Sequence, residues 1–564
     1  MNTSYQTLIE ALQAAPAEKP FVTMWNSDED SSTVSFGEFS QWAQRQASMF
    51  ARHGLTRNDK IILIMPQGIE LMAAFAGAMM LGAVPAILAY PNFKVEPNKY
   101  RFGIKGVTSN LRARLIVLDA AFPEEMLDFI ASAESTEVVR SVGQKGGEAS
   151  GPVILGPARS QDLAFIQHSA GTTGLQKGVA LSHAAVLRQL HHLCEVLRLR
   201  PEDRVYSWLP LYHDMGLIAC FMMPMVLHMH VVMQSPTDWV MSPGTMLQLI
   251  SQYRCTLVWV PNFAFQFVAR RADPEDIAGL DLSSARMLIN CSEPVRASSI
   301  DEFVTALAPF GLRPEAMQSS YAMAENVFAV TQSGIGDRPM PARTFVRDGD
   351  FRNQHRAVPC HAQTPGALCF VSSGSCLPNN EVRIVSDGGA DLPEGGVGEI
   401  LIRSDSMLDG YYNRPDLTAK ILKDGWYWSG DLGFLLDGEL YVVGRKKDLI
   451  IIAGKNIYPQ DVEEIVFSHP SIHPGRAVAF GIYNQELGTE DLIAVAEVND
   501  ETSLADALRI ESAIKNAIIG ELGVTVRTVY LKPPKWIIKS TAGKPARSST
   551  REKLMSEHPE LQRT

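Results

Sequence analysis

Short apolar runs alternate with amphipathic stretches along roughly the first 330 residues of the chain. Runs predicted to form strands include residues 61–65, 114–118, 163–168, 205–209, 231–234, 256–260 and 287–290. Residues 184–199 and 245–253 repeat apolar positions at helical spacing, and Ser182 stands where a helix cap is expected. Alternation of this kind predicts parallel β-α-β units rather than a sandwich.

After about residue 365 the pattern changes to short strands separated by Gly and Pro turns. This change predicts a small β-rich subdomain at about 365–443. From about residue 447 helical and strand patterns mix again, with helices predicted at 460–467 and 512–522. The chain has no internal repeat, which excludes a solenoid. The pattern therefore predicts an α/β protein with a β-rich part.

Composition narrows the function classes. The chain has 564 residues, of which 46% are hydrophobic and 20% charged, and its net charge is −11. These values are typical of a globular protein and exclude a disordered tail, a collagen and a coiled coil. The acidic balance also argues against a nucleic-acid-binding protein, which needs a basic field.

The sequence predicts a cytoplasmic protein. The first 20 residues lack the charged-then-apolar order of a signal peptide. The most apolar run, residues 215–232, contains Pro224, His228 and His230, so we expect buried core rather than a transmembrane segment. The seven cysteines include no Cys-x-x-Cys pair, which predicts reduced thiols and no zinc site.

The first candidate for chemistry is the run Ser-Ala-Gly-Thr-Thr-Gly-Leu-Gln-Lys-Gly at 169–178, directly after a predicted strand. Small residues let backbone N–H groups approach an anion, hydroxyls add donors, and Lys177 adds charge. The spacing of a Walker A loop is absent, which disfavours a Walker-type NTPase. A flexible turn is the alternative for this run taken alone.

Five further motifs follow in order along the chain. They are Leu-Pro-Leu-Tyr-His-Asp-Met-Gly-Leu at 209–217, Tyr-Ala-Met-Ala-Glu at 321–325, Tyr-Trp-Ser-Gly-Asp-Leu at 427–432, Gly-Arg-Lys-Lys-Asp at 444–448 and Lys-Ser-Thr-Ala-Gly-Lys at 539–544. Together with the loop they resemble the acyl-adenylate-forming superfamily. The resemblance implies an N-terminal domain, residues 1–446, of two doubly wound α/β subdomains plus the β-rich subdomain. A small mobile α+β domain, residues 447–564, follows it.

Within that superfamily the chain is most similar to fatty acyl-AMP ligases. The residues that carry this likeness are Gln167-His168-Ser169, the run Pro-Asn-Phe-Ala-Phe at 261–265, Ala324 before Glu325, Val-Ser-Ser-Gly at 371–374, and residues 455–463. The stretch at about 340–365 resembles the insertion that separates these ligases from CoA-using relatives. An ordinary surface loop is the alternative for that stretch.

The resemblance implies a nucleotide site and a metal ligand. Its ATP-binding residues are Ser169, Gly171, Thr172, Thr173, Gly174, Lys177, Asn290, Cys291, Ser292, Glu293, Ser320, Tyr321, Ala322, Asp431 and Arg445. Asp431 is expected to accept hydrogen bonds from the ribose hydroxyls, and Arg445 to contact ribose or phosphate. Glu325 is expected to bind Mg²⁺, which prefers oxygen ligands.

The resemblance also implies the catalytic groups. Lys544 matches the lysine that bridges the acid and the α-phosphate, where a cation stabilises developing charge. Lys447 matches the hinge between the two domains, about which relatives rotate the small domain to admit the thiol. His213 resembles a gate residue beside the carboxylate, and a hydrogen-bonded core histidine is its alternative.

The expected acyl pocket departs from the fatty acyl-AMP ligases, which tend to have glycines where this chain has larger side chains. Its expected lining residues are Ala219, Cys220, Phe221, Trp259, Val260 and Phe263. Larger side chains occupy volume that a long acyl chain needs. This predicts a shorter or differently shaped acid, medium-chain or cyclic.

These residues predict an ATP- and Mg²⁺-dependent ligase that converts a fatty or related carboxylic acid to acyl-AMP. The acyl group is then expected to pass to the phosphopantetheine thiol of an acyl carrier protein, as in polyketide or lipopeptide biosynthesis. An acyl-CoA ligase that uses free CoA is the alternative. A non-catalytic nucleotide-binding protein with the same fold is an alternative of another class. The particular acid, the carrier protein and the oligomeric state are not indicated.

Overall fold

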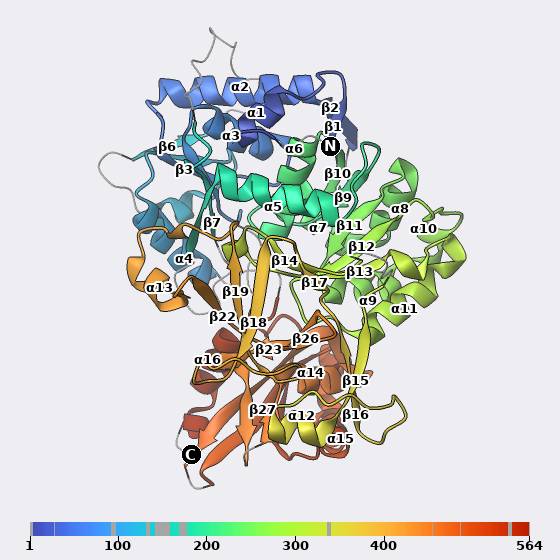
Figure 1. The fold of residues 1–564 in the computed structure, drawn as a ribbon. Coiled ribbons are helices and arrows are strands. Elements are labelled where there is room, and N and C mark those ends of the chain that lie inside the picture. Colours follow the sequence, from blue (N-terminus) through green and yellow to red (C-terminus); the bar gives the residue numbers. More distant parts are fainter. Residues whose placement is uncertain are drawn as a thin grey trace.

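The computed structural model describes residues 4–27, 29–91, 97–130, 136–141, 158–168, 177–334, 340–453, 455–485, 487–539 and 544–562. Figure 1 shows the C-terminal elements, in orange to red, gathered at the lower end of the molecule, below a larger body formed by most of the rest of the chain. The two chain ends lie far apart, at the upper and lower parts of that view. Among the described residues, no helix combines the length and apolar character that a membrane span requires.

A large mixed sheet forms the centre of the larger body. Its strand order is β17-β14-β13-β12-β11-β9-β10-β1-β2, and the strands from β13 to β1 are parallel. The strands are β1 (Pro20–Asn26), β2 (Glu29–Ser35), β9 (Arg204–Ser207), β10 (His230–Gln234), β11 (Leu257–Val260), β12 (Met287–Cys291), β13 (Met317–Ala322), β14 (Ala329–Gln332) and β17 (Ser375–Cys376). Parallel strands end at a common edge, where ligands bind in open α/β sheets.

A second, smaller sheet is entirely parallel. Its order is β4-β3-β5-β6, formed by β3 (Lys60–Ile64), β4 (Val84–Ile87), β5 (Leu115–Leu118) and β6 (Glu137–Arg140). Beside it β7 (Leu163–His168), β8 (Gly178–Ser182) and β20 (Gly410–Tyr411) form a short antiparallel sheet. β7 and β8 flank the Gly-rich loop, so this sheet fixes both ends of that loop.

Helices cover the sheets of the larger body. They are α1 (Leu8–Gln13), α2 (Phe36–Arg52), α3 (Ile69–Met80), α4 (Pro97–Leu111), α5 (His183–Val196), α6 (Met223–Leu227), α7 (Pro236–Met241), α8 (Gly244–Tyr253), α9 (Asn262–Arg271), α10 (Pro274–Ile277) and α11 (Ala297–Leu307). A capping box of Ser35 and Glu38 begins α2. α2 packs closely on α3, because a Cβ at Gly77 would lie 2.5 Å from the Ala43 carbonyl oxygen.

The β-rich part follows the large sheet in the chain. It is an antiparallel sheet of β18 (Asn380–Val385), β19 (Gly398–Ser404), β21 (Leu422–Lys423), β22 (Trp426–Leu436) and β23 (Glu439–Arg445), with α13 (Pro415–Ile421) beside it. Before it, the predicted insertion folds as a hairpin of β15 (Arg343–Arg347) and β16 (Ala367–Val371) that carries helix α12 (Asp348–Gln354).

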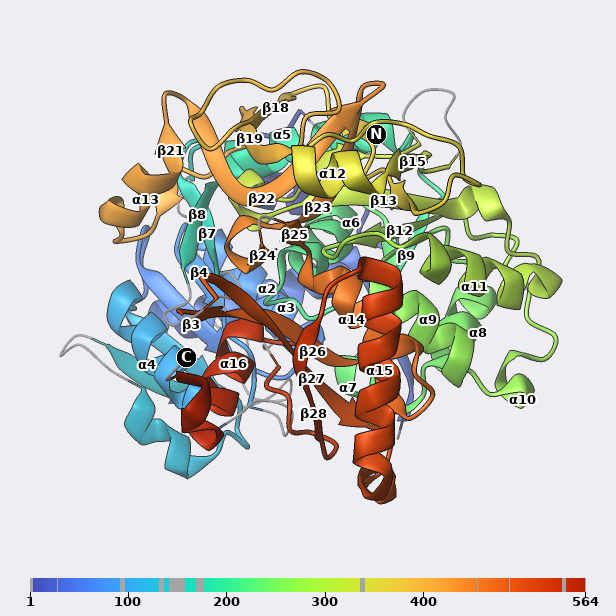
Figure 2. The same cartoon turned by 90° about the horizontal axis from the view of Figure 1, so that it is seen from below.

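The C-terminal elements have a hydrophobic core of their own. They are β24 (Ile450–Ile452), β25 (Lys455–Ile457), α14 (Pro459–Ser468), β26 (Ile472–Asn484), β27 (Thr489–Val498), α15 (Ala507–Leu522), β28 (Val526–Lys532) and α16 (Arg547–Glu557). Figure 2 shows their sheet and helices, in orange to red, in front of the larger body. A 3-10 turn, Lys446–Asp448, joins them to β23. The division at residues 446 and 447 stays a prediction.

The α/β fold class is confirmed, and each run predicted as a strand overlaps one in the structure. Ser182 caps α5 as expected, because its side chain accepts a hydrogen bond from the Ala185 N–H. One expectation was wrong: β7 pairs antiparallel with β8 instead of joining a parallel unit. The apolar run at 215–232 is buried except at the half-buried His228 and His230, and it begins as a π-helix, Met215–Met222.

Candidate active site

The chain that leaves β9 places His213 and Asp214 at the carboxyl edge of the large sheet. His213 Nδ1 lies 2.7 Å from an Asp214 carboxylate oxygen, which also accepts the Met215 N–H at 2.8 Å. Burial opposes ionisation of Asp214, but His213, the Met215 N–H and Lys544 outweigh it and hold the pKa of that carboxyl below its usual value. Asp214 is therefore a mostly buried carboxylate that is held ionised beside His213.

The π-helix begins immediately after this pair. Its path passes close to the strand end, because a Cβ at Gly216 would lie 2.4 Å from the Pro210 carbonyl oxygen. π-Helical turns are rare and often occur at functional sites. Because any side chain at residue 216 would clash with the Pro210 carbonyl oxygen, steric contact explains why the motif has glycine there.

Lys544 reaches the same edge of the sheet from the C-terminal domain. Its ammonium group donates a hydrogen bond to the Ser292 carbonyl oxygen, which follows the end of β12. Ser292 has a φ of +72°, a conformation that favours glycine and is costly for other residues. The motif that ends at Lys544 therefore meets the motif around Ser292, and both lie near Asp214.

The motif at 290–293 is held by helix α9. The Asn290 side-chain amide donates to Asn262 Oδ1 at 2.8 Å, and the Phe263 N–H donates to the Glu293 carboxylate at 3.0 Å. Asn290 and Cys291 are buried, and burial raises the pKa of the Cys291 thiol to about 12. The Cys291 thiol therefore stays protonated near neutral pH.

Asp431 on β22 organises the opposite side of the site. The Tyr321 hydroxyl at the end of β13 donates to an Asp431 carboxylate oxygen at 2.7 Å, and Arg445 Nε lies 3.3 Å from the other oxygen. Burial and the nearby carboxylate raise the pKa of Tyr321, so its hydroxyl keeps the proton that it donates. Ser320 faces away from this group, because its hydroxyl bonds the Thr331 carbonyl oxygen. Ala322 is the last residue of β13.

Glu325 lies in a 3-10 turn just after β13 and meets Tyr411. The Tyr411 hydroxyl donates to a Glu325 carboxylate oxygen at 2.6 Å, and the Lys177 ammonium lies 4.8 Å from the centre of the Tyr411 ring. Tyr411 therefore joins the predicted metal ligand to the end of the Gly-rich loop. Of the loop residues, Ser169, Gly171, Thr172, Thr173 and Gly174 lie outside the described residues.

The residues expected to line the acyl pocket divide between two places. Ala219, Cys220 and Phe221 lie in the π-helix, whereas Trp259 and Val260 are in β11 and Phe263 is in α9; all but Phe263 are fully buried. The Phe221 ring packs against Phe21, Phe39 and Phe75 in the aromatic core. The pocket assignment of these residues stays a prediction.

The two residues that flank Lys447 at the predicted hinge each form ion pairs. Lys446 lies 2.9 Å from both Asp387 and Glu399 in the β-rich part. On the other side Asp448 accepts from Arg547 at 2.6 Å, and Arg547 also lies 2.7 Å from buried Glu463 on α14. Lys446 is therefore tied to the larger body, and Asp448 to the C-terminal domain.

Sequence reasoning missed Asp214, Tyr411 and Arg547. Asp214 lies inside the motif at 209–217, so its position was visible but its partners were not. Tyr411 lies in the stretch predicted as β-rich, outside every quoted motif. Arg547 follows Lys544 by three positions, and that nearness was the available signal. The contacts themselves join residues that are far apart in sequence, such as Tyr411 and Glu325.

The AMP-binding enzyme family profile matches residues 9–412, which is most of the chain and includes the sites around His213, Ser292 and Glu325. The chain belongs to the AMP-binding enzyme family. It is 31% identical to the medium-chain-fatty-acid–[acyl-carrier-protein] ligase JamA of Moorena producens, over 98% of this chain and 95% of that protein. It is 29% identical to the 4-hydroxyphenylalkanoate adenylyltransferase of Mycobacterium marinum, over 94% and 87%.

A comparison with solved structures also supports the assignment of this chain to the AMP-binding enzyme family. One of the fatty acyl-adenylate ligases from E. coli and L. pneumophila superposes with a TM-score of 0.90 at 28% identity, covering 99% of both chains. The likeness thus extends beyond residue 412 into the C-terminal domain, which carries Lys544.

We expect Asp431 of this AMP-binding enzyme to control nucleotide affinity. Asp431→Ala removes an acceptor that Tyr321 and Arg445 share, and hydrogen bonds to a charged group contribute about 1.5–3 kcal/mol. ATP should bind on the order of 10- to 100-fold more weakly, as measured by calorimetry. Asp431→Asn, which keeps one acceptor oxygen, should lose less. Unchanged affinity in Asp431→Ala would refute the ribose assignment.

Proposed function

We propose that this enzyme converts a carboxylic acid and ATP to acyl-AMP and pyrophosphate, and then transfers the acyl group to the phosphopantetheine thiol of an acyl carrier protein. The observation that carries this proposal is the contact between Lys544 and the Ser292 carbonyl oxygen. It brings a cation of the C-terminal domain to the sheet edge where the nucleotide motifs meet. The relatives named above activate acids, and JamA by its name acts with a carrier protein.

In the first half-reaction a carboxylate oxygen attacks the α-phosphorus of ATP. An O–P bond forms, the bond to the bridging oxygen breaks, and pyrophosphate leaves. Catalysis of such a transfer consists of positioning and charge stabilisation. Lys544 supplies positive charge where the acid and the α-phosphate meet. The Asp214 carboxylate lies close enough to Lys544 for the two charges to interact.

The nucleotide is held by residues of the β-rich part, of the large sheet and of the Gly-rich loop. Asp431 accepts from the ribose hydroxyls, Arg445 contacts ribose or phosphate, and the Tyr321 ring lies against the adenine. Lys177 and the loop before it bind the β- and γ-phosphates. Glu325 is the side chain that fits Mg²⁺, because it is a carboxylate that accepts from the Tyr411 hydroxyl, and the Tyr411 ring in turn meets the Lys177 ammonium. That ion neutralises phosphate charge when it is bound.

In the second half-reaction the thiol attacks the acyl carbonyl of the adenylate. A C–S bond forms, the C–O bond to phosphate breaks, and AMP leaves. Rotation of the C-terminal domain about Lys447 removes Lys544 and admits the thiol. We place the reaction in the cytoplasm, where reduced thiols persist.

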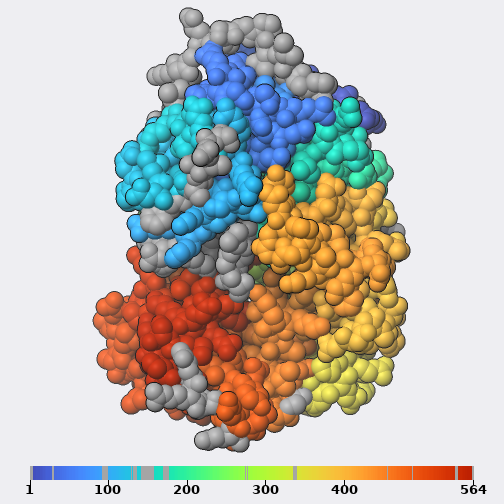
Figure 3. All heavy atoms as spheres, turned by 90° about the vertical axis from the view of Figure 1, so that its left-hand side faces the viewer, coloured from blue at the N-terminus to red at the C-terminus, as the bar shows by residue number. Residues whose placement is uncertain are grey.

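The contacts that the insertion makes favour a carrier protein over free CoA as the acceptor. Helix α12 packs on the C-terminal domain, and its buried Arg352 lies 2.6 Å from Asp348 and 3.0 Å from Asp461 on α14. The Phe351 ring meets Tyr458, with the ring centres 5.6 Å apart. Figure 3 shows yellow atoms of this part of the chain next to orange atoms at the lower end of one face of the molecule. These contacts hold the C-terminal domain in the orientation that serves adenylation.

We expect Arg352→Ala to increase acyl-CoA formation. The substitution removes the ion pair to Asp461, so the C-terminal domain separates more readily from the insertion. Acyl-CoA formed from free CoA should rise at least several-fold, while acyl-AMP formation changes by less than about threefold, by mass spectrometry of both products. Arg347→Ala is the matched control, because Arg347 is exposed and lies 3.8 Å from Asp350. Equal acyl-CoA formation in both variants would overturn the role of the insertion.

The acid is proposed to be medium-chain or cyclic. Trp259 and Val260 are fully buried side chains at the end of β11, and in this proposal they reduce the volume open to a long chain. The names of two relatives cover both classes, a medium-chain fatty acid and a 4-hydroxyphenylalkanoate. Activity that increases with chain length up to long-chain acids would contradict this substrate class.

Acid-dependent exchange of labelled pyrophosphate into ATP tests the first half-reaction. The enzyme is incubated with ATP, Mg²⁺ and a panel of medium-chain, long-chain and aryl acids. Exchange with at least one medium-chain or cyclic acid supports the proposal. The absence of exchange with every acid favours a non-catalytic nucleotide-binding protein.

A further inference from the structure

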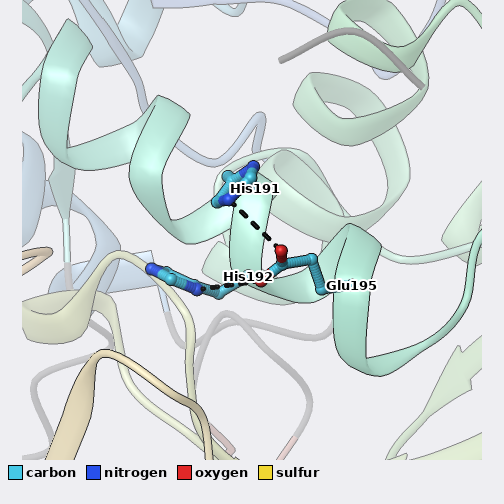
Figure 4. A group of neighbouring side chains, drawn as sticks. All are labelled: His191, His192 and Glu195. Atoms are coloured by element: carbon cyan, nitrogen blue, oxygen red, sulfur yellow. Dashed lines mark ion pairs between the residues drawn. The ribbon is translucent and has the colours of Figure 1, made fainter. Parts of the chain in front are cut away.

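The last turns of α5 carry two histidines and a glutamate that face one another. Figure 4 shows His191, His192 and Glu195, with an ion pair running from each imidazole to the carboxylate. Their ligand atoms all lie within 4.8 Å of one another. None of the three belongs to the site described above.

The spacing of these atoms suits a tetrahedral metal ion. His191 Nε2 lies 3.5 Å from one Glu195 oxygen, and His192 Nδ1 lies 3.5 Å from the other. A zinc ion with bonds of about 2.0–2.1 Å places neighbouring ligand atoms about 3.3–3.4 Å apart. Both separations therefore need only a few tenths of an ångström of adjustment. Rotation of the half-exposed His191 ring closes the remaining distance between the imidazoles.

A second observation points to a ligand at this cluster. Within the described part of the chain the buried His192 Nδ1 makes no hydrogen bond, since its 3.5 Å approach to Glu195 has no hydrogen-bond geometry, and the His192 side chain is only 19% exposed. A buried ring nitrogen without a partner costs free energy that a bound ion would recover. The cluster also lies at the carboxyl end of α5, where the helix dipole favours a cation.

We propose that His191, His192 and Glu195 bind a zinc-class divalent transition-metal ion, with water in the fourth position. Two imidazoles and one carboxylate are a known donor set for Zn²⁺, whereas Mg²⁺ prefers oxygen ligands in octahedral geometry. This site is separate from the Mg²⁺ that serves adenylation. The ion would join residues one turn apart and so stabilise the C-terminal end of α5.

Zinc titration of the metal-free full-length enzyme tests this proposal. Zn²⁺ is added in competition with a chromophoric chelator, in the presence of excess Mg²⁺ and ATP. We expect one ion per chain at this site, and about tenfold or greater loss of affinity in His191→Ala, His192→Ala and Glu195→Gln. Glu202→Gln, an exposed glutamate just beyond the helix, is the matched control and should bind like the parent enzyme. Equal affinity in all five proteins overturns the proposal.

The free cysteines are a competing source of zinc ligands, and Cys194 lies on the same helix. The ligand atoms that gather within 4.8 Å of one another come from His191, His192 and Glu195, and Cys194 is not part of that group. Cys194→Ser should therefore bind zinc unchanged, and the Co²⁺ form should lack a thiolate charge-transfer band. Loss of binding in Cys194→Ser, or a thiolate band in the Co²⁺ spectrum, would overturn the assignment. A zinc-dependent rise in Tm that disappears in Glu195→Gln would support it.

Discussion

Lys544→Ala is expected to slow acyl-adenylate formation by about two to three orders of magnitude, the usual loss when one charge-stabilising donor is removed. Lys544 bonds the Ser292 carbonyl oxygen and lowers the pKa of Asp214, so it lies at the edge where the α-phosphate is expected. Thioester formation from a preformed acyl-adenylate should be nearly unchanged, because the proposed rotation about Lys447 would remove Lys544 from that step.

The two half-reactions are measured separately for this variant. Pyrophosphate exchange reports the first, and transfer from purified acyl-AMP to a loaded carrier protein reports the second. Lys420→Ala is a suitable control, because Lys420 is an exposed lysine of the larger body. Equal loss of both half-reactions in Lys544→Ala would contradict the assignment of Lys544 to the first step alone.

Arg547→Ala is expected to destabilise the C-terminal domain by about 3–5 kcal/mol, the cost of breaking a buried ion pair by removing one partner. Arg547 is the cation between Asp448 and Glu463, at 2.6 and 2.7 Å, and the three side chains are all less than one-fifth exposed. Burial already raises the pKa of Glu463, and without Arg547 that carboxyl loses the cation that opposes the rise.

Urea unfolding, followed by a probe in the C-terminal domain, measures this loss. Arg551→Ala, one turn further along α16, removes a charge that contacts neither carboxylate and should stay within about 0.5 kcal/mol of the parent. Arg547→Lys should recover part of the stability, since a point charge replaces the two-sided guanidinium. An unchanged unfolding midpoint in Arg547→Ala would show that the carboxylates need no cation.

The strands of the larger body were predictable because their apolar runs are short and regularly spaced. The direction of β7 was not, since its antiparallel pairing with β8 leaves no mark in the run at 163–168. The π-helix at Met215–Met222 was equally hidden, because its residues are all apolar and show no periodicity.

The candidate site was predictable as a set of motifs but not as a set of contacts. Asp431 and Lys544 were named from their motifs, yet the hydrogen bond from Tyr321 to Asp431 spans 110 positions and exists only in the folded chain. The same holds for Arg352, whose partner Asp461 lies in another domain. Phe221 was assigned to the acyl pocket from the resemblance, and the ring contacts that it makes with Phe21, Phe39 and Phe75 were not visible in the sequence.

The most direct test of the central claim is mass spectrometry of the products formed from ATP, Mg²⁺ and a panel of acids. Each reaction is run without acceptor, with CoA, and with a phosphopantetheinylated carrier protein. The account predicts acyl-AMP that accumulates despite CoA and disappears when the carrier protein is added. Ready formation of acyl-CoA from free CoA would contradict it.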